Sequence, residues 1–218
     1  SFVLSNLVGW NSTYLALEGS VLNRYEPISI DLIDEGGKPN TFGWSGRANF
    51  ETNGFFAKAE WVGAGDKYYN NPDPSDGNWY LKKKGNAQLL ELGYNGRGLG
   101  VTLTGRRLEW MDSKIIAGNT STSNMMNYIP AMCTQYTYML TTHHPYNAQT
   151  GNIIGNFINS GEIGGQIDAF YNFRRGTAIG GKRGMKVHAN FSTYYTIEKE
   201  GTCNPGNLLF RDFSFDVE

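Results

Sequence analysis

The histidines are few, and none falls into a pattern that catalysis or metal binding requires. No G-x-S-x-G, Walker, H-E-x-x-H or C-x-x-C motif occurs in the 218 residues. His143 and His144 are adjacent, so on an extended chain they point to opposite sides, and no neighbouring carboxylate completes a ligand set. His188 lies between Lys186 and Asn190 on the polar side of an alternating segment, where we expect it to face water. The sequence therefore predicts no catalytic residue, no metal and no cofactor, and a protein that is not an enzyme.

The chain contains two cysteines, Cys133 and Cys203. Two thiols are too few for a disulfide-rich scaffold or a four-cysteine zinc site. In an oxidising envelope compartment they would form one disulfide, and two unpaired thiols are the alternative that the residues leave open.

The strongest candidate for ligand contact is a polar loop that we expect over residues 65–86. Its oxygen-rich centre, residues 70–77, lacks the spaced ladder of an EF-hand calcium site, and Lys82, Lys83 and Lys84 follow it. Lysines at the rim of a membrane protein would meet lipid phosphates. Four aromatic residues that would stack on sugar rings flank the centre: Tyr68, Tyr69, Trp79 and Tyr80. A loop that is polar only for solubility is the simpler alternative.

The segment 174–184 is rich in glycine and carries four basic residues, Arg174, Arg175, Lys182 and Arg183. No helix is expected to follow it, so it lacks the dipole of a phosphate-binding loop. We predict a flexible basic turn.

The overall composition excludes two classes of protein. Nineteen Lys and Arg against twenty Asp and Glu give a net charge of −1, without the broad basic field that nucleic-acid binding requires. No apolar run approaches the roughly 18–20 residues of a transmembrane helix. The chain has 28 Gly, 13 Tyr and 12 Phe and a mean hydropathy of −0.44, which favours sheets with one apolar and one polar face.

Apolar and polar residues alternate in stretches of about ten, the pattern of β-strands with two different faces. The clearest stretches are residues 41–51, 55–61, 87–94, 99–110, 163–173 and 185–197. Weaker candidates are residues 13–22, 131–141 and 208–217. Tight turns are expected at 53–54 and 95–98, which predicts β-hairpins. About nine strands and no convincing helix result.

The length of these strands favours a membrane barrel over a soluble sandwich. Transmembrane strands need about 9–11 residues, whereas strands of soluble proteins most often have about 5–6. Small residues interrupt the apolar faces, and aromatic residues gather at strand ends in the manner of the girdles of outer-membrane barrels. We predict an all-β, antiparallel, up-and-down transmembrane β-barrel forming a single domain over residues 1–218. Alternation alone leaves a soluble β-sandwich as the alternative.

Several short motifs resemble an uncharacterised family of Bacteroidota outer-membrane β-barrel proteins. They are GYNGRGLGVTL at residues 93–103, RRLEWMD at 106–112, NYIPA at 127–131, QYTYML at 135–140, Tyr146 with Gln149, and GGKRGMK at 180–186. The similarity covers roughly residues 85–217. It implies a fold and a location, but no reaction and no catalytic residue.

One departure concerns the end of the chain. Outer-membrane barrels commonly end on an aromatic residue, whereas this sequence stops at Asp216-Val217-Glu218 directly after an expected strand. Together with the odd strand count, this predicts that the chain forms part of a larger barrel.

These observations predict a non-enzymatic protein of the Gram-negative outer membrane that acts as a channel or as a scaffold subunit of an envelope assembly. Its partners would be outer-membrane lipid and other envelope proteins, and no nucleic acid. The alternative is a secreted or surface β-sandwich that binds glycans or a protein through its aromatic-rich loops.

Overall fold

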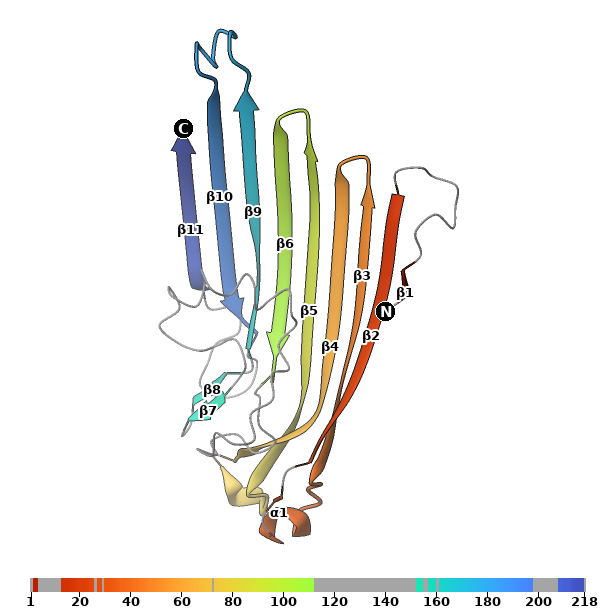
Figure 1. Cartoon of the computed structure of the whole chain (residues 1–218). Helices are drawn as coiled ribbons and strands as arrows, with labels where there is room; N and C mark the ends of the chain where they lie inside the picture. The colour runs from red at the N-terminus through yellow and green to blue at the C-terminus, as the bar shows by residue number, and fades with distance from the viewer. Residues whose placement is uncertain are drawn as a thin grey trace.

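The computed structural model describes residues 2–3, 13–25, 27–28, 30–71, 73–111, 152–154, 157–159, 161–197 and 208–217. Eight long strands dominate these residues (Figure 1). They are β2 (Thr13–Tyr25), β3 (Asn40–Thr52), β4 (Phe55–Asn70), β5 (Tyr80–Gly96), β6 (Leu99–Glu109), β9 (Gly161–Phe173), β10 (Met185–Thr196) and β11 (Leu208–Val217). The short elements are β1 (Phe2–Val3), α1 (Ile30–Asp34), the 3-10 helix η1 (Pro74–Asp76), β7 (Asn152–Ile154) and β8 (Phe157–Asn159).

The long strands form one antiparallel sheet in which neighbours in sequence are neighbours in space. Its order is β1-β2-β3-β4-β5-β6-β9-β10-β11, and β7 pairs only with β8. In the described residues the sheet is open, with β1 and β11 at its two edges. The all-β, antiparallel, up-and-down arrangement predicted from the alternation is therefore confirmed.

The strand boundaries differ from the expected ones at the β4–β5 connection. The expected polar loop over residues 65–86 is wrong, because β4 continues to Asn70, β5 begins at Tyr80, and only residues 71–79 connect them. The register shifts between Ala64 and Asp66, a β-bulge that interrupts the period-two pattern in the middle of the strand. The helix α1 was also not expected, and the strand candidate at 131–141 lies outside the described residues.

Two tight turns close hairpins at one end of the sheet, which we call the short-turn end. Asn53 and Gly54 both have positive φ, 47° and 84°, and Arg97 and Gly98 have 53° and 85°. Positive φ at both central residues defines a type I′ turn, whose twist matches that of the flanking strands. The β9–β10 connection lies at the same end, whereas α1 and η1 lie at the opposite end (Figure 1).

Successive hairpins at the short-turn end extend further and further, as Figure 1 shows. Phe55, the first residue of β4, pairs with Tyr94, and β5 continues two residues beyond this level to Gly96. Leu99 of β6 pairs with Tyr171, and β9 again continues for two more residues. Each hairpin is thus displaced by two residues relative to the preceding one.

One face of the sheet, the apolar face, is largely uncovered. Its central row crosses all eight long strands at one level: Leu15, Phe50, Ala57, Leu92, Leu103, Ile167, Phe191 and Phe213. Large apolar side chains on this face, such as Leu103 and Ile167, are 45% and 47% exposed. Among the described residues, the buried hydrophobic clusters do not cover these side chains.

The opposite face, the polar face, carries charged residues in the middle and a small hydrophobic cluster toward the α1 end. The buried members of this cluster are Val62, Ala64, Ala87, Leu108 and Met111. A second cluster joins Leu32 of α1 to Tyr68 of β4 and orders the α1 end. No helix in the described part of the chain is long and apolar enough to cross a membrane.

Aromatic rings repeatedly lie over a glycine on the neighbouring strand. The four directly paired examples are Trp44 with Gly63, Phe56 with Gly93, Phe170 with Gly100, and Tyr194 with Gly164. In each pair, a Cβ added to the glycine would lie within 2.5 Å of an atom of the ring. The glycines provide the space that the rings fill, which gives a packing reason for the joint abundance of Gly and aromatic residues.

Candidate functional site

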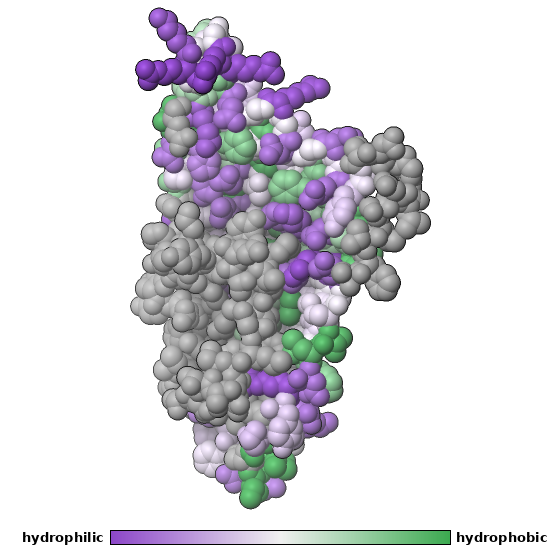
Figure 2. Space-filling model, in the orientation of Figure 1, coloured by the Kyte–Doolittle hydropathy of each residue, from purple (hydrophilic) through white to green (hydrophobic). Residues whose placement is uncertain are grey.

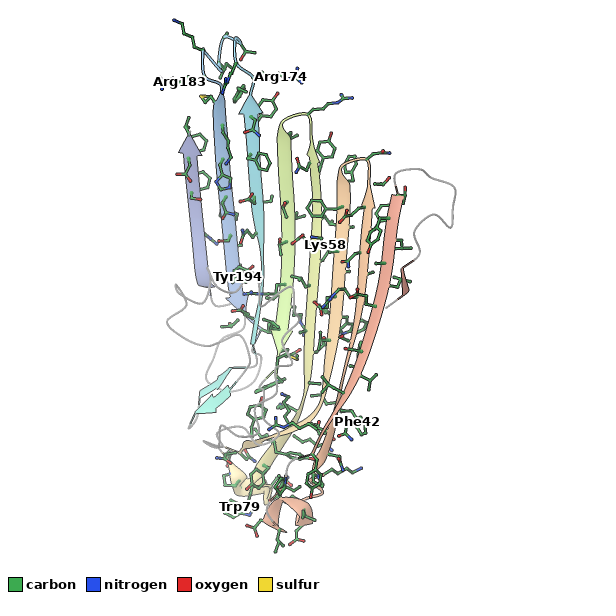
Figure 3. All side chains as sticks on the ribbon, viewed as in Figure 1. Phe42, Lys58, Trp79, Arg174, Arg183 and Tyr194 are labelled. Carbon is green, nitrogen blue, oxygen red and sulfur yellow. The ribbon has the colours of Figure 1, made fainter. Side chains whose placement is uncertain are left out.

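The four aromatic residues predicted to contact a ligand do not form one surface. Tyr68 is 3% exposed and packs against Leu32, while Tyr69 is 1% exposed and its ring lies 4.8 Å from that of Trp110. Trp79 is exposed at the α1 end of the molecule (Figure 3), and Tyr80 begins β5. Ligand contact through these residues stays a prediction, and only Trp79 projects into solvent.

The oxygen-rich connection between β4 and β5 uses its side chains to order its own backbone. The Asn71 Oδ1 accepts from the amide of Asp73 at 3.1 Å, and the Asp73 Oδ1 accepts from that of Ser75 at 3.2 Å. The Glu35 carboxylate accepts from the amides of Trp79 and Tyr80 at 3.1 and 3.2 Å, joining the α1 segment to this turn. These oxygens therefore have a structural role. Within the described ranges, no three His, Cys, Asp or Glu side chains are grouped to hold a metal ion.

The three lysines that follow this turn lie in β5. The Lys82 ammonium lies 2.9 Å from the Asp66 carboxylate, and this hydrogen bond raises the pKa of Lys82 above its ordinary value against the opposing effect of desolvation. The Lys83 ammonium lies 5.4 Å from the centre of the Trp110 ring. Contact of these lysines with lipid phosphates stays a prediction, as does the Cys133–Cys203 disulfide, whose cysteines lie outside the described residues, like His143 and His144.

The strand register creates a set of ion pairs across the polar face, which we call the charge ladder. Arg47 of β3 lies directly between Glu18 of β2 and Glu60 of β4, and its two terminal nitrogens are each 3.0 Å from a carboxylate oxygen. On the next level, Lys58 of β4 pairs with Glu91 of β5 at 3.1 Å. The ladder thus links four adjacent strands.

One further ion pair on the polar face is more deeply buried than those of the charge ladder. The Arg106 guanidinium on β6 pairs with the Glu162 carboxylate on β9, and the two side chains are 1% and 0% exposed. The guanidinium also lies 4.7 Å from the ring centre of Tyr194 on β10, a cation–π contact (Figure 3). Because both charges are buried, each stabilises the other, and removing one takes away an ionic partner that water does not replace.

The histidine that the sequence left without a partner has one across the sheet. The His188 Nε2 lies 2.7 Å from the Asp168 Oδ2, which also accepts a hydrogen bond from the side-chain Nδ2 of Asn190 at 3.1 Å. The His188 Nδ1 lies 3.8 Å from an oxygen of Asp216. His188 pairs directly with Phe170, so Asp168 is its diagonal neighbour. Only the register could have identified this cluster, because β9 and β10 are separated by the eleven residues 174–184.

These contacts define a class of protein: a large antiparallel β-sheet with an exposed apolar face and a polar face of paired charges, some of which are buried. The chain belongs to a family of unknown function (DUF6029), whose profile matches residues 1–218. No curated protein and no solved structure matches it. The prediction of an uncharacterised family is thereby confirmed.

Proposed function

We propose that this protein is a non-enzymatic, membrane-spanning β-sheet protein of the Gram-negative outer membrane that acts as a scaffold subunit of an envelope assembly. The observation that carries the proposal is the exposed apolar face. Monomeric soluble proteins rarely expose contiguous apolar patches larger than a few hundred Å². Here the central row alone crosses eight strands. Lipid is the environment in which such a face loses no hydrophobic free energy.

A sandwich would cover this face with a second sheet. In the described residues, the one other sheet is formed by β7 and β8, which have three residues each. Such a hairpin is too small to cover eight long strands. This comparison favours lipid over a second β-sheet as the cover of the apolar face.

The displacement of the hairpins gives a second supporting argument. Two residues span about 6.8 Å along a strand, and two strand spacings span about 9.6 Å. If the turns lie at one membrane surface, these lengths correspond to a strand tilt of about 35°, at the lower end of the roughly 35–45° found in transmembrane barrels. The register therefore has the stagger that a tilted membrane sheet requires.

The spacing of aromatic residues on the apolar face supports the same arrangement. Phe55, whose ring contacts that of Tyr94, lies near the short-turn end, and Trp44 and Trp61 contact each other nearer the α1 end. Eight residues separate Phe55 from Gly63, the partner of Trp44. This separation is about 27 Å along the strand. For a strand tilted by about 35°, it is about 22 Å along the membrane normal, close to the apolar band of about 25 Å in outer-membrane barrels.

The ends of the sheet fit this location too. Outer-membrane barrels have short turns on the periplasmic side and longer loops outside. We therefore assign the short-turn end to the periplasm and the α1 end to the cell exterior. The resemblance to Bacteroidota outer-membrane proteins supports the location in the outer membrane.

The charge ladder favours a scaffold over a wide channel. The side chains of Glu60 and Glu91 are 2% exposed, and that of Glu162 is 0% exposed. A wide water-filled pore would leave such carboxylates hydrated. Outer-membrane lipid and other envelope proteins are the partners that a scaffold of this kind requires.

The proposal is tested by placing a charge on each face of β6. Leu103→Arg introduces a cation into the central row of the apolar face, whereas Thr102→Arg introduces one on the adjacent polar face. Arginine at the midplane of a bilayer costs about 2–4 kcal/mol. We expect vesicles to retain wild type and Thr102→Arg after an alkaline wash, and to retain far less Leu103→Arg.

Equal behaviour of the two variants, or a wild-type protein that stays monomeric and soluble without detergent, would contradict the membrane-spanning proposal and favour the sandwich. With the retained wild type, we expect no large steady conductance across a planar bilayer. A large conductance would contradict the scaffold proposal and indicate a channel.

A further inference from the structure

The β9–β10 turn, residues 174–184, carries four basic residues at the short-turn end of the sheet. Its basic residues are Arg174, Arg175, Lys182 and Arg183, and its eleven residues include no Asp or Glu. Figure 2 shows hydrophilic side chains gathered at this end of the molecule, and Figure 3 places Arg174 and Arg183 there. Arg97, in the turn of the neighbouring hairpin, adds a fifth cation.

Hydrogen bonds close the backbone of this basic turn, and its flexibility stays a prediction. The Gly176 amide donates to the Gly181 carbonyl at 2.7 Å, and the Gly184 amide donates to the Gly180 carbonyl at 2.7 Å. The Arg175 Nε donates to the Arg183 carbonyl at 3.0 Å. The backbone therefore brings the four basic residues together around one closed turn.

A groove of about 570 Å³ lies between this turn and the neighbouring hairpin. Arg97 and Arg174 line it, and neither forms an ion pair with another described residue. Tyr171, Phe173 and Ile179 provide an apolar wall, and the first two continue the apolar face of β9. Ile179 is 60% exposed at the turn. The groove thus combines anion-binding groups with an apolar surface that is continuous with the lipid-facing side.

We propose that this groove binds an anionic phospholipid, with Arg97 and Arg174 on its phosphate and Tyr171, Phe173 and Ile179 against the first part of its acyl chains. The inference rests on the proposed function, because it requires the apolar face to lie in a bilayer. Guanidinium groups bind phosphate through paired N–H donors, and aromatic rings favour the level of the headgroups. The short-turn end would therefore select anionic lipid in the periplasmic leaflet.

The test compares spin-labelled phosphatidylglycerol with spin-labelled phosphatidylcholine around the full chain reconstituted in phosphatidylcholine vesicles. We expect the motionally restricted population to favour phosphatidylglycerol by about fivefold, the factor associated with roughly one basic residue at an anionic surface. The variant Arg97→Gln/Arg174→Gln is expected to abolish this preference. The matched control Lys182→Gln/Arg183→Gln removes two exposed charges of the same turn that do not line the groove and is expected to retain it.

Preference that persists in Arg97→Gln/Arg174→Gln, or is absent from wild type in the vesicles, would overturn the phospholipid site alone. Loss of the preference when inorganic phosphate replaces chloride at equal ionic strength would also overturn it, by assigning the groove to a free anion. Failure of wild type to enter phosphatidylcholine vesicles would instead overturn the proposed function, and this inference with it. Equal incorporation of wild type and both variants is the folding control.

Discussion

At the scale of single residues, the stability of the polar face depends on ion pairs that differ in their contact with water. Arg106 and Glu162 are almost completely buried, whereas Lys82 and Asp66 form an exposed pair, with side-chain exposures of 51% and 28%. Breaking a buried pair leaves one charge desolvated and uncompensated, while an exposed charge is hydrated again. The two pairs should therefore differ greatly in their effect on stability.

We predict that Arg106→Met lowers the free energy of unfolding by about 3–5 kcal/mol, because it removes the guanidinium from a buried ion pair with the Glu162 carboxylate. Lys82→Met is expected to change it by at most about 1 kcal/mol. Urea unfolding in lipid vesicles, followed by tryptophan fluorescence, measures both. The double variant Arg106→Met/Glu162→Leu should recover most of the loss, and a double variant no more stable than Arg106→Met would contradict this account.

At the scale of the element, aromatic rings over glycines join neighbouring strands. A Cβ on Gly93 would lie 2.2 Å from the ring of Phe56 and 2.7 Å from the backbone oxygen of Val101. A small rotation of the Phe56 ring would not make room for it, because the backbone oxygen would still be too close. Gly105, on β6, would accept a Cβ with no atom within 4 Å. The two glycines thus offer a matched pair of substitutions on adjacent strands.

Gly93→Ala should destabilise the protein by about 1–3 kcal/mol through overpacking. Gly105→Ala is expected to be neutral or to stabilise by up to about 1 kcal/mol, because alanine loses less backbone entropy than glycine in a strand. The same urea titration in vesicles compares them. Equal destabilisation by the two substitutions would show that the ring contacts do not determine the role of Gly93.

The sequence allowed most strands to be predicted, because alternation survives wherever one face is apolar and the other polar. Alternation did not identify the strands at residues 65–70 and 80–86. There the bulge beside Gly65 changes the period, and three successive lysines resemble a loop. The five-residue helix α1 is too short to display a helical period. Local pattern thus identifies regular strands, but not the irregular positions that extend or connect them.

The contacts of the candidate site were less accessible to sequence, because they depend on register. Arg47 meets Glu18 and Glu60 across distances of 29 and 13 residues in the chain. A shift by one residue would send each of these side chains to the other face. The polar character of the face could be predicted, but the partners within it could not.

At the scale of the whole molecule, three features share one physical explanation. The apolar face is exposed, the hairpins step by two residues, and aromatic residues lie at two levels on the same face. Each is expected of a tilted sheet with lipid on one side. The basic groove at the short-turn end extends this explanation to the membrane surface.

The most direct test of this account is spin-label accessibility along β9 in vesicles, in a background with Cys133 and Cys203 replaced by serine. Single cysteines at 166, 167, 168 and 169 sample the two faces alternately. The account predicts high oxygen and low nickel-chelate accessibility at 167 and 169, and the lower oxygen accessibility of a packed polar face at 166 and 168. Nickel-chelate accessibility that is highest at 167 and 169 would place the apolar face in water and contradict the membrane-spanning sheet.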